Sequence, residues 1–313
     1  MQTILTLTMN PSVDKSSSAH NVVPERKLRC ESPRYEPGGG GINVSRAIRT
    51  LGGESVIVYP AGGPSGRMLG DLLDQEGLGH HPIQIKGWTR EDFIVREEST
   101  GQQFRFSMPG PVLQDKEWNR CLSEVPRIDP KPYYIVASGS LPPGVPKDFY
   151  ARVARLARDL GARMILDTSG EALSLALREG VFLIKPNLRE LKEVAEHEIE
   201  DELQQEDLAR QIVSSGQSEV VVISVGAAGA MVMTKDGCEH LRAPTVPIKS
   251  KVGAGDSMVA GIVLSLAKGL ALKDAVRFGV AAGAAAVMTP GTELCRRKDV
   301  ERLYKRMTSE ATP

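Results

Sequence analysis

The stretch KSKVGAGDSMVAG, Lys249–Gly261, places a glycine pair and one aspartate directly before an apolar run. The following segment, Ser257–Lys268, is compatible with a helix. The first backbone N–H groups of a helix have no intrahelical partner, and small residues beside them let a phosphate approach closely. Asp256 could be a simple N-cap, or it could accept a proton from a hydroxyl that attacks a bound phosphoryl group. The motif alone leaves both readings open. The residues expected at this helix start are Gly253, Ala254 and Gly255.

Short β-rich runs alternate with helical patterns along most of the chain. The predicted strands are Ile4–Thr8, Ser55–Tyr59, Tyr133–Ala137, Arg163–Asp167, Phe182–Ile184 and Val220–Ser224. The predicted helices are Ile42–Leu51, Gly66–Gln75, Lys147–Leu160, Leu188–His197 and Leu203–Ser214. Near-continuous apolar strands separated by helices predict a parallel sheet covered on both faces. Ligands of such sheets collect at the carboxyl ends of the strands, so the polar segments after those strands are the candidate sites.

Two polar stretches interrupt this alternation. Asp14–Glu36 has no helical period, and Asp92–Met108 alternates around a turn signal at Ser99-Thr100-Gly101, as a hairpin does. In the second arm of the hairpin, one face carries Phe104, Phe106 and Met108, and the other carries Gln103, Arg105 and Ser107. We expect a small antiparallel sheet. It could be a lid over a site, with its apolar face on a partner subunit, or an edge extension of the main sheet.

The composition narrows the class of protein. The 313 residues suffice for one large domain, with or without a small appendage, and 39 Lys and Arg balance 39 Asp and Glu. A nucleic-acid partner is disfavoured because phosphate neutralisation normally requires a basic excess. The four cysteines and five histidines show no ligand spacing, so a zinc site is not expected. With no signal peptide and no apolar span of membrane length, we expect a soluble cytoplasmic protein without a membrane partner.

The usual nucleotide-binding motifs are absent. There is no Gly-Lys pair for a P-loop, and Gly38-Gly39-Gly40-Gly41 lacks the third glycine of a dinucleotide fingerprint. Those glycines still precede the helix Ile42–Leu51, where they would permit close backbone approach of a ligand. Other polar groups follow predicted strands, and each alone is more often a cap or turn residue than a site. Their concentration at several strand ends favours a site; they are Asp14, Asp167, Lys185, Asn187, Glu190, Ser224, Gly226 and Gly229.

Four motifs together resemble one family, the ribokinase-like (PfkB) sugar kinases. They are PGGGGINVSRAI, KPNxxE at Lys185–Glu190, SVGAAG at Ser224–Gly229 and VGAGDS at Val252–Ser257, and their order and spacing agree across essentially the whole chain. The resemblance implies a three-layer α/β/α sandwich with a mainly parallel central sheet and a small antiparallel β lid. It also implies a single domain, 1–313, with lid segments at about 14–36 and 88–110.

The resemblance implies an ATP-dependent phosphoryl transfer and assigns roles to its motifs. Asp256 would be the base, and the amides of Gly253, Ala254 and Gly255 would form an anion hole for the transferring phosphate. Asn187 and Glu190 would hold Mg²⁺ through water. The residues implied to bind ATP are Lys185, Asn187, Ser224, Gly226, Gly229 and, near the adenine, Gly283.

For the acceptor, the resemblance implies that sugar hydroxyls are bound by Asp14, Gly39, Asn43, Ser138 and Asp256. Cationic side chains in the lid segments favour a sugar phosphate over a neutral sugar, because guanidinium–phosphate pairing is strong; they are Lys27, Arg29, Arg90 and Arg105. GGGG, KLRC and SGSLPPG most resemble family members that convert fructose 6-phosphate to fructose 1,6-bisphosphate in glycolysis. Tagatose 6-phosphate and fructose 1-phosphate remain alternative substrates, and a non-catalytic sugar or nucleotide sensor remains an alternative function.

Two further expectations come from the resemblance. Many members bind a monovalent cation through a loop that corresponds here to Ser250, Val252, Ala286, Thr289 and Gly291, so K⁺ binding is implied. Lys251 departs from the small polar residue usual at its position, and it could leave that site intact or place an ammonium there. A homodimer through the lid is also implied, in agreement with the apolar hairpin face.

Overall fold

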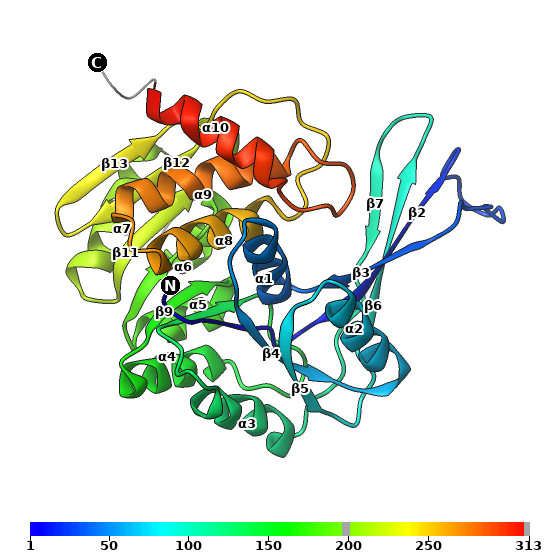
Figure 1. Ribbon diagram of the computed structural model, residues 1–313, viewed down its shortest axis with the longest axis horizontal. Coiled ribbons are helices and arrows are strands. Elements are labelled where there is room, and N and C mark those ends of the chain that lie inside the picture. Colours follow the sequence, from blue (N-terminus) through cyan, green and yellow to red (C-terminus); the bar gives the residue numbers. More distant parts are fainter. Residues whose placement is uncertain (196–200, 310–313) are drawn as a thin grey trace.

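The computed structural model describes residues 1–195 and 201–309 and has a nine-stranded sheet at its centre (Figure 1). The strand order is β13-β12-β11-β10-β9-β8-β1-β4-β5, and every pairing from β5 to β11 is parallel, whereas β12 and β13 are antiparallel additions at one edge. The strands are β1 (Ile4–Leu7), β4 (Val56–Ala61), β5 (Gly79–Gln84), β8 (Tyr134–Ser138), β9 (Arg163–Asp167), β10 (Val181–Ile184), β11 (Ser218–Ser224), β12 (Ala230–Thr234) and β13 (Gly237–Leu241). The mainly parallel sheet is therefore confirmed.

Helices cover both faces of this sheet. They are α1 (Gly40–Thr50), α2 (Gly63–Gln75), α3 (Asp115–Glu124), α4 (Phe149–Leu160), α5 (Gly170–Leu177), α6 (Leu188–Val194), α7 (Glu202–Ser214), α8 (Ala254–Ala267), α9 (Leu272–Ala286) and α10 (Arg297–Ser309). The predicted helix Leu188–His197 ends at Val194, and His197 lies outside the described residues. No described helix is long and apolar enough to cross a membrane.

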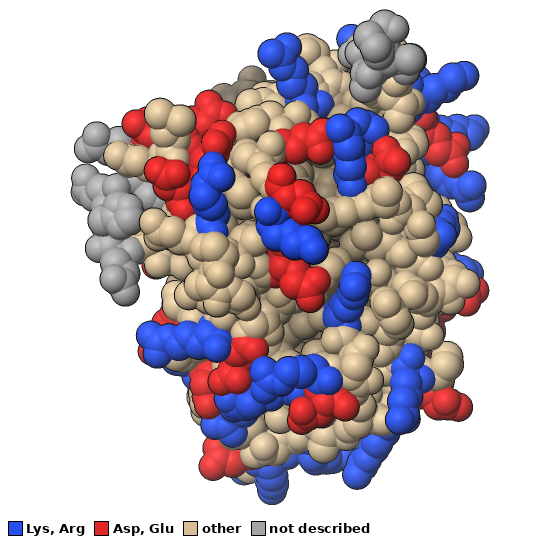
Figure 2. Space-filling model, turned by 90° about the vertical axis from the view of Figure 1, so that its left-hand side faces the viewer, with Lys and Arg blue, Asp and Glu red and all other residues tan. Residues whose placement is uncertain are grey.

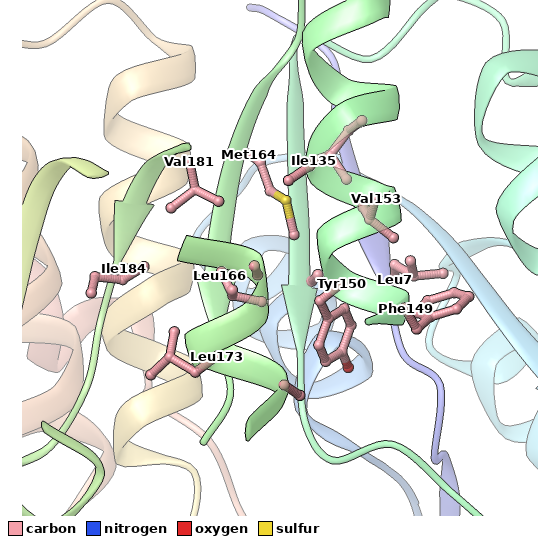
Figure 3. Packing of buried hydrophobic residues seen from close by; sticks show 14 of the residues in the cluster. Leu7, Ile135, Phe149, Tyr150, Val153, Met164, Leu166, Leu173, Val181 and Ile184 are labelled. Atoms are coloured by element: carbon pink, nitrogen blue, oxygen red, sulfur yellow. The ribbon is translucent and has the colours of Figure 1, made fainter. Parts of the chain in front are cut away.

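The alternation of side chains along the strands divides the core into two layers. In β8, Ile135 and Ala137 pack under α3 to α7, whereas Tyr134 and Val136 pack under α1 and α8 to α10. Figure 3 shows the first layer, where Ile135 and Met164 on the sheet lie beside Val153 of α4. This three-layer arrangement confirms the expected α/β/α sandwich.

A second, four-stranded sheet stands apart from the main one, at the right in Figure 1. Its order is β3-β2-β6-β7; the outer pairings are antiparallel, and the central β2–β6 pairing is parallel. Its strands are β2 (Ser12–Ala19), β3 (Arg34–Gly38), β6 (Arg90–Glu97) and β7 (Gln103–Phe106). The predicted small sheet and its hairpin are present; the function of this sheet as a lid stays a prediction.

The second arm of the hairpin, β7, separates apolar from polar side chains as predicted, although the buried Ile94 of β6 lies on the face of Arg105. Phe106 pairs with Phe93 across the strands, with ring centroids 6.4 Å apart, whereas Arg105 pairs with Ile94 on the other face. Phe106 keeps 47% and Met108 49% of its surface exposed. The apolar face of the small sheet is therefore only partly covered by its own chain.

The edge strands β12 and β13 lie on the side of the molecule that faces the viewer in Figure 2. Acidic and basic side chains are interspersed there, and neither sign forms an extended region of its own.

Candidate active site

The start of α8 has an open N-terminus. Its N-cap is Gly253, in the left-handed conformation with φ 71°, and a Cβ at this position would lie 2.5 Å from Leu294 Cδ2. Asp256 therefore lies within the first turn, and its alternative reading as the N-cap is wrong. In the described part of the chain, no side chain accepts a hydrogen bond from the amides of Ala254 or Gly255. These donors are available to an anion, and the helix dipole favours one.

Asp256 is oriented from another helix. Asn43 of α1 donates through Nδ2 to Asp256 Oδ2 over 3.0 Å. Burial, and next the negative charge of Asp167, raise the pKa of Asp256 to about 6, although Asn43, Lys185 and Arg105 act in the opposite direction. Asp256 is thus a half-buried carboxylate that binds a proton more tightly than an ordinary aspartate, as a general base requires.

A buried ion pair adjoins this helix start. Lys185 Nζ lies 3.2 Å from Asp167 Oδ1, and only 4% of the Lys185 surface is exposed. Burial opposes its charge, but Asp167, Glu190 and Asp256 hold the Lys185 pKa above the ordinary lysine value. A Cβ at Gly255 would lie 3.5 Å from Lys185 Nζ, so a fixed positive charge stands beside the open amides of α8.

Asn187 and Glu190 close the start of α6. Asn187 Oδ1 accepts from the Glu190 amide at 3.0 Å, and Glu190 Oε2 accepts from the Asn187 amide at 2.9 Å, which is a capping box. Burial, more than any other cause, raises the pKa of Glu190. An isolated parallel bridge joins Asn187 to Ser224, so the ends of β10 and β11 converge here as expected.

The three remaining glycines of the predicted ATP set have different surroundings. Gly226, with φ 59°, faces open space, so a ligand could approach it. At Gly229 a Cβ would lie 2.0 Å from the Leu241 carbonyl oxygen, and at Gly283 it would lie 3.2 Å from that of Ala254. Chain packing accounts for these last two glycines, and their contact with ATP stays a prediction.

The predicted sugar-binding residues surround the start of α1. Gly39 is its N-cap, with φ 109°. A Cβ at Gly40 would lie 2.3 Å from Ser138 Oγ, and one at Gly38 would lie 2.3 Å from Asp14 Oδ1, so both side chains flank the glycine run. Burial raises the pKa of Asp14 above the ordinary value, and Asp92 adds to this while a hydrogen bond from Ser12 Oγ opposes it.

The predicted phosphate-binding cations do not form one cluster within a chain. Arg90 bonds to both carboxylate oxygens of Asp92, at 2.9 and 2.8 Å, and to the Asn10 carbonyl. Arg105 is exposed on β7 and pairs with Ile94 of β6, so the strand register puts it on the same face of the small sheet as Asp14. Lys27 and Arg29 lie in the exposed loop between β2 and β3, at the end of that sheet farthest from α8 (Figure 1).

The residues of the predicted cation loop do converge. Ser250 Oγ donates to the Gly291 carbonyl at 2.7 Å and accepts from the Val252 amide at 3.2 Å. Thr289 Oγ1 donates to the Ala286 carbonyl at 2.7 Å. Lys251 is exposed, so its side chain does not fill this loop.

Asp167 is a strand-end residue to which the sequence assigned no role. In the structure its carboxylate pairs with Lys185, and its negative charge helps to raise the pKa of Asp256. Asp167 is paired with Ser138 at the ends of β9 and β8, so it lies at the same edge of the sheet as the other predicted site residues.

Comparison with known proteins identifies the family of the chain. A family model described as "pfkB family carbohydrate kinase" matches residues 7–299. The chain is 45% identical over 302 residues to the ATP-dependent 6-phosphofructokinase isozyme 2 of Mycobacterium tuberculosis, covering 96% of this chain and 89% of that one. It is 42% identical to the Escherichia coli isozyme 2, covering 97% and 98%. A 1-phosphofructokinase of Bacillus subtilis is less similar, at 32%.

Solved structures give the same result for the fold. Phosphofructokinase-2 from Escherichia coli in complex with potassium superposes with a TM-score of 0.95 at 42% identity, covering 98% of this chain and 100% of that one. The same enzyme in complex with fructose-6-phosphate gives a TM-score of 0.93. Ribokinase from Thermotoga maritima, 20% identical, shares the fold with a TM-score of 0.76. This chain therefore belongs to the pfkB family of carbohydrate kinases.

Proposed function

We propose that this chain is an ATP-dependent 6-phosphofructokinase, which transfers the γ-phosphoryl group of ATP to the C1 hydroxyl of fructose 6-phosphate. The observation that carries the proposal is the open start of α8, where Asp256, held by Asn43, adjoins unpaired amides and the Lys185 ammonium. The two relatives above 40% identity named 6-phosphofructokinase support the choice of reaction.

Asp256 takes the proton in this mechanism. Asn43 engages Oδ2, so Oδ1 remains for the C1 hydroxyl. As the hydroxyl oxygen forms its bond to the γ-phosphorus, its proton passes to Asp256, and the broken P–O bond leaves its electron pair on ADP. The amides of Ala254 and Gly255, together with the α8 dipole, stabilise the charge that the phosphoryl oxygens carry in the transition state.

Asn187 and Glu190 are the proposed contacts to Mg²⁺ through water. Glu190 uses Oε2 for the α6 cap, and no hydrogen bond to its Oε1 occurs among residues 1–195 and 201–309, so one carboxylate oxygen can meet a hydrated cation. When bound, Mg²⁺ would supply positive charge that neutralises the nucleotide phosphates. The loop that contains Ser250 and Gly291 is the proposed K⁺ site, because it offers backbone carbonyl oxygens as ligands. The side chain of Lys251 is exposed and does not occupy this site.

We propose that Arg105 and Arg90 recognise the 6-phosphate. Arg105 shares a sheet face with Asp14, and an exposed guanidinium is free to pair with a phosphate. Lys27 and Arg29 belong to the loop between β2 and β3, at the far end of the small sheet (Figure 1). They would contribute to a site on a second subunit, which accords with a homodimer formed through the apolar face of the small sheet. Sedimentation as a monomer would contradict this assembly.

A coupled ADP-release assay over sugars and sugar phosphates tests the function. We expect kcat/KM to be highest for fructose 6-phosphate, lower for tagatose 6-phosphate and fructose 1-phosphate, and lowest for fructose. A preference for either of the other two phosphates would assign a different substrate to the same chemistry. ATP binding without turnover of any acceptor would instead indicate a sensor.

A further inference from the structure

A group of metal-ligating side chains lies outside the active site, between α7 and the edge strand β13. Cys238 and His240 are two residues apart on β13 and so share a face, while Glu202 and Glu206 are four apart on α7 and share the facing side. Pairing with Met233 and Met231 puts Cys238 and His240 on the α7 side of the sheet. This edge faces the viewer in Figure 2.

We propose that Cys238, His240 and Glu206 form a site for a zinc ion. Their ligand atoms all lie within 4.8 Å of one another. Cys238 Sγ is 3.6 Å from His240 Nε2, and that nitrogen is 3.0 Å from Glu206 Oε1. Zn–S and Zn–N bonds of about 2.3 and 2.0 Å at a tetrahedral angle put sulfur and nitrogen about 3.5 Å apart. The apo side chains are thus already spaced for one ion.

The second nitrogen of the imidazole has the partner that a metal-bound histidine needs. His240 Nδ1 lies 3.3 Å from Glu202 Oε1, so this carboxylate can accept the Nδ1 proton and fix the tautomer that offers Nε2 to the ion. Glu202 is accordingly a positioning residue rather than a ligand. His240 keeps 45% of its side chain exposed, which leaves a path for entry and a fourth position for water.

Zinc fits this donor set better than Mg²⁺ or Ca²⁺, because thiolate and imidazole are poor ligands for those hard cations. On binding, the thiol of Cys238 would release its proton to solvent, since the thiolate is the ligand. The site lies on the α7 face, whereas α8 covers the opposite face. We therefore expect it to stabilise the β13 edge without taking part in phosphoryl transfer.

Equilibrium dialysis of the reduced, metal-free full-length protein against Zn²⁺ tests the proposal. We expect about one tightly bound ion per chain, lost in Cys238→Ser and in His240→Asn and retained in Cys30→Ser, which removes an exposed cysteine elsewhere. Glu202→Gln should keep the stoichiometry but weaken the affinity roughly 10- to 100-fold.

Co²⁺ provides a second measurement. A near-ultraviolet thiolate-to-cobalt band should appear in the wild type and in Cys30→Ser but not in Cys238→Ser. Circular dichroism of each metal-free variant checks that it is folded without reference to kinase activity. A wild type that binds no Zn²⁺, or a folded Cys238→Ser that binds it as tightly, would overturn the proposal.

Discussion

Two helices begin at neighbouring points of the same sheet edge, and they begin differently. The start of α6 is closed, because Asn187 and Glu190 pair their side chains with each other's amides. The start of α8 is open, because its N-cap is a glycine without a side chain. A closed start stabilises the helix, whereas an open start leaves donors for a ligand. The contrast is between a helix start whose first amides are satisfied by its own side chains and one whose amides remain for the proposed phosphoryl group.

The largest expected effect comes from the carboxylate at the open start. Asp256→Asn should lower kcat roughly 10²- to 10⁴-fold while ATP still binds, because the fold and the α8 amides remain. Steady-state kinetics and ATP titration check this. Asp236→Asn, an exposed residue in the β12–β13 turn, is the matched control. Near-normal turnover of Asp256→Asn would remove it as the base.

The same variant should be more stable than the wild type at pH 7. The pKa of Asp256 is about 6 in the fold, above its ordinary 3.8, so stability is lost as pH rises through that window. The neutral amide avoids this loss, and we expect the free energy of unfolding to rise by about 1–2 kcal/mol at pH 7. Urea unfolding at pH 4 and pH 7 measures this change, and the difference between the two proteins should be much smaller at pH 4.

The next effect tests the glycine that keeps the helix start open. Gly253→Ala forces a side chain into a left-handed position against Leu294 and should reduce kcat roughly 10- to 100-fold by displacing the α8 amides. Gly216→Ala introduces similar backbone strain at φ 74°, and no atom of the described residues lies within 4 Å of the added Cβ. Both variants should lose stability, but only Gly253→Ala should lose turnover. Equal losses of turnover in the two variants would mean that backbone strain, and not the position of the α8 amides, causes the loss.

A smaller effect is expected on the small sheet. Arg105→Ala should raise KM for fructose 6-phosphate roughly tenfold with little change in kcat, because a phosphate contact of this kind binds ground and transition states alike. Arg96→Ala is the control, since Arg96 is exposed on the neighbouring strand β6. An unchanged KM in Arg105→Ala would remove this guanidinium from the substrate site.

The smallest effect concerns a closed helix start away from the site. Asp201 caps α7 by accepting from the Gln204 amide at 2.9 Å. Asp201→Ala should lower the free energy of unfolding by about 1 kcal/mol and leave kcat and KM unchanged. A lower kcat in Asp201→Ala would contradict the view that this helix start contributes to stability and not to catalysis.

Much of the architecture could be predicted because the central strands are continuous apolar runs. The ends of β1, β8, β9 and β10 each lie within two residues of the predicted strand ends. Helix starts were less predictable where glycine begins the helix: α1 starts at Gly40 rather than Ile42, because glycine is a weak helix former and hides the boundary.

The edge of the sheet was not predicted, and this had a consequence for the metal ligands. Strand β13 is short and half exposed, so Cys238 and His240 gave no periodic signal. Without that strand, their alignment with Glu206 of α7 could not be inferred from spacing along the chain. Ligands that converge from a strand and a distant helix become visible only once the topology is known.

The pH dependence of kcat/KM for fructose 6-phosphate at saturating ATP tests the central claim most directly. With Asp256 as the base, activity should rise with pH through an apparent pKa near 6, because only the ionised carboxylate accepts the proton. The residual activity of Asp256→Asn should lack this acid limb. An identical acid limb in the variant would show that another group takes the proton and would contradict the account.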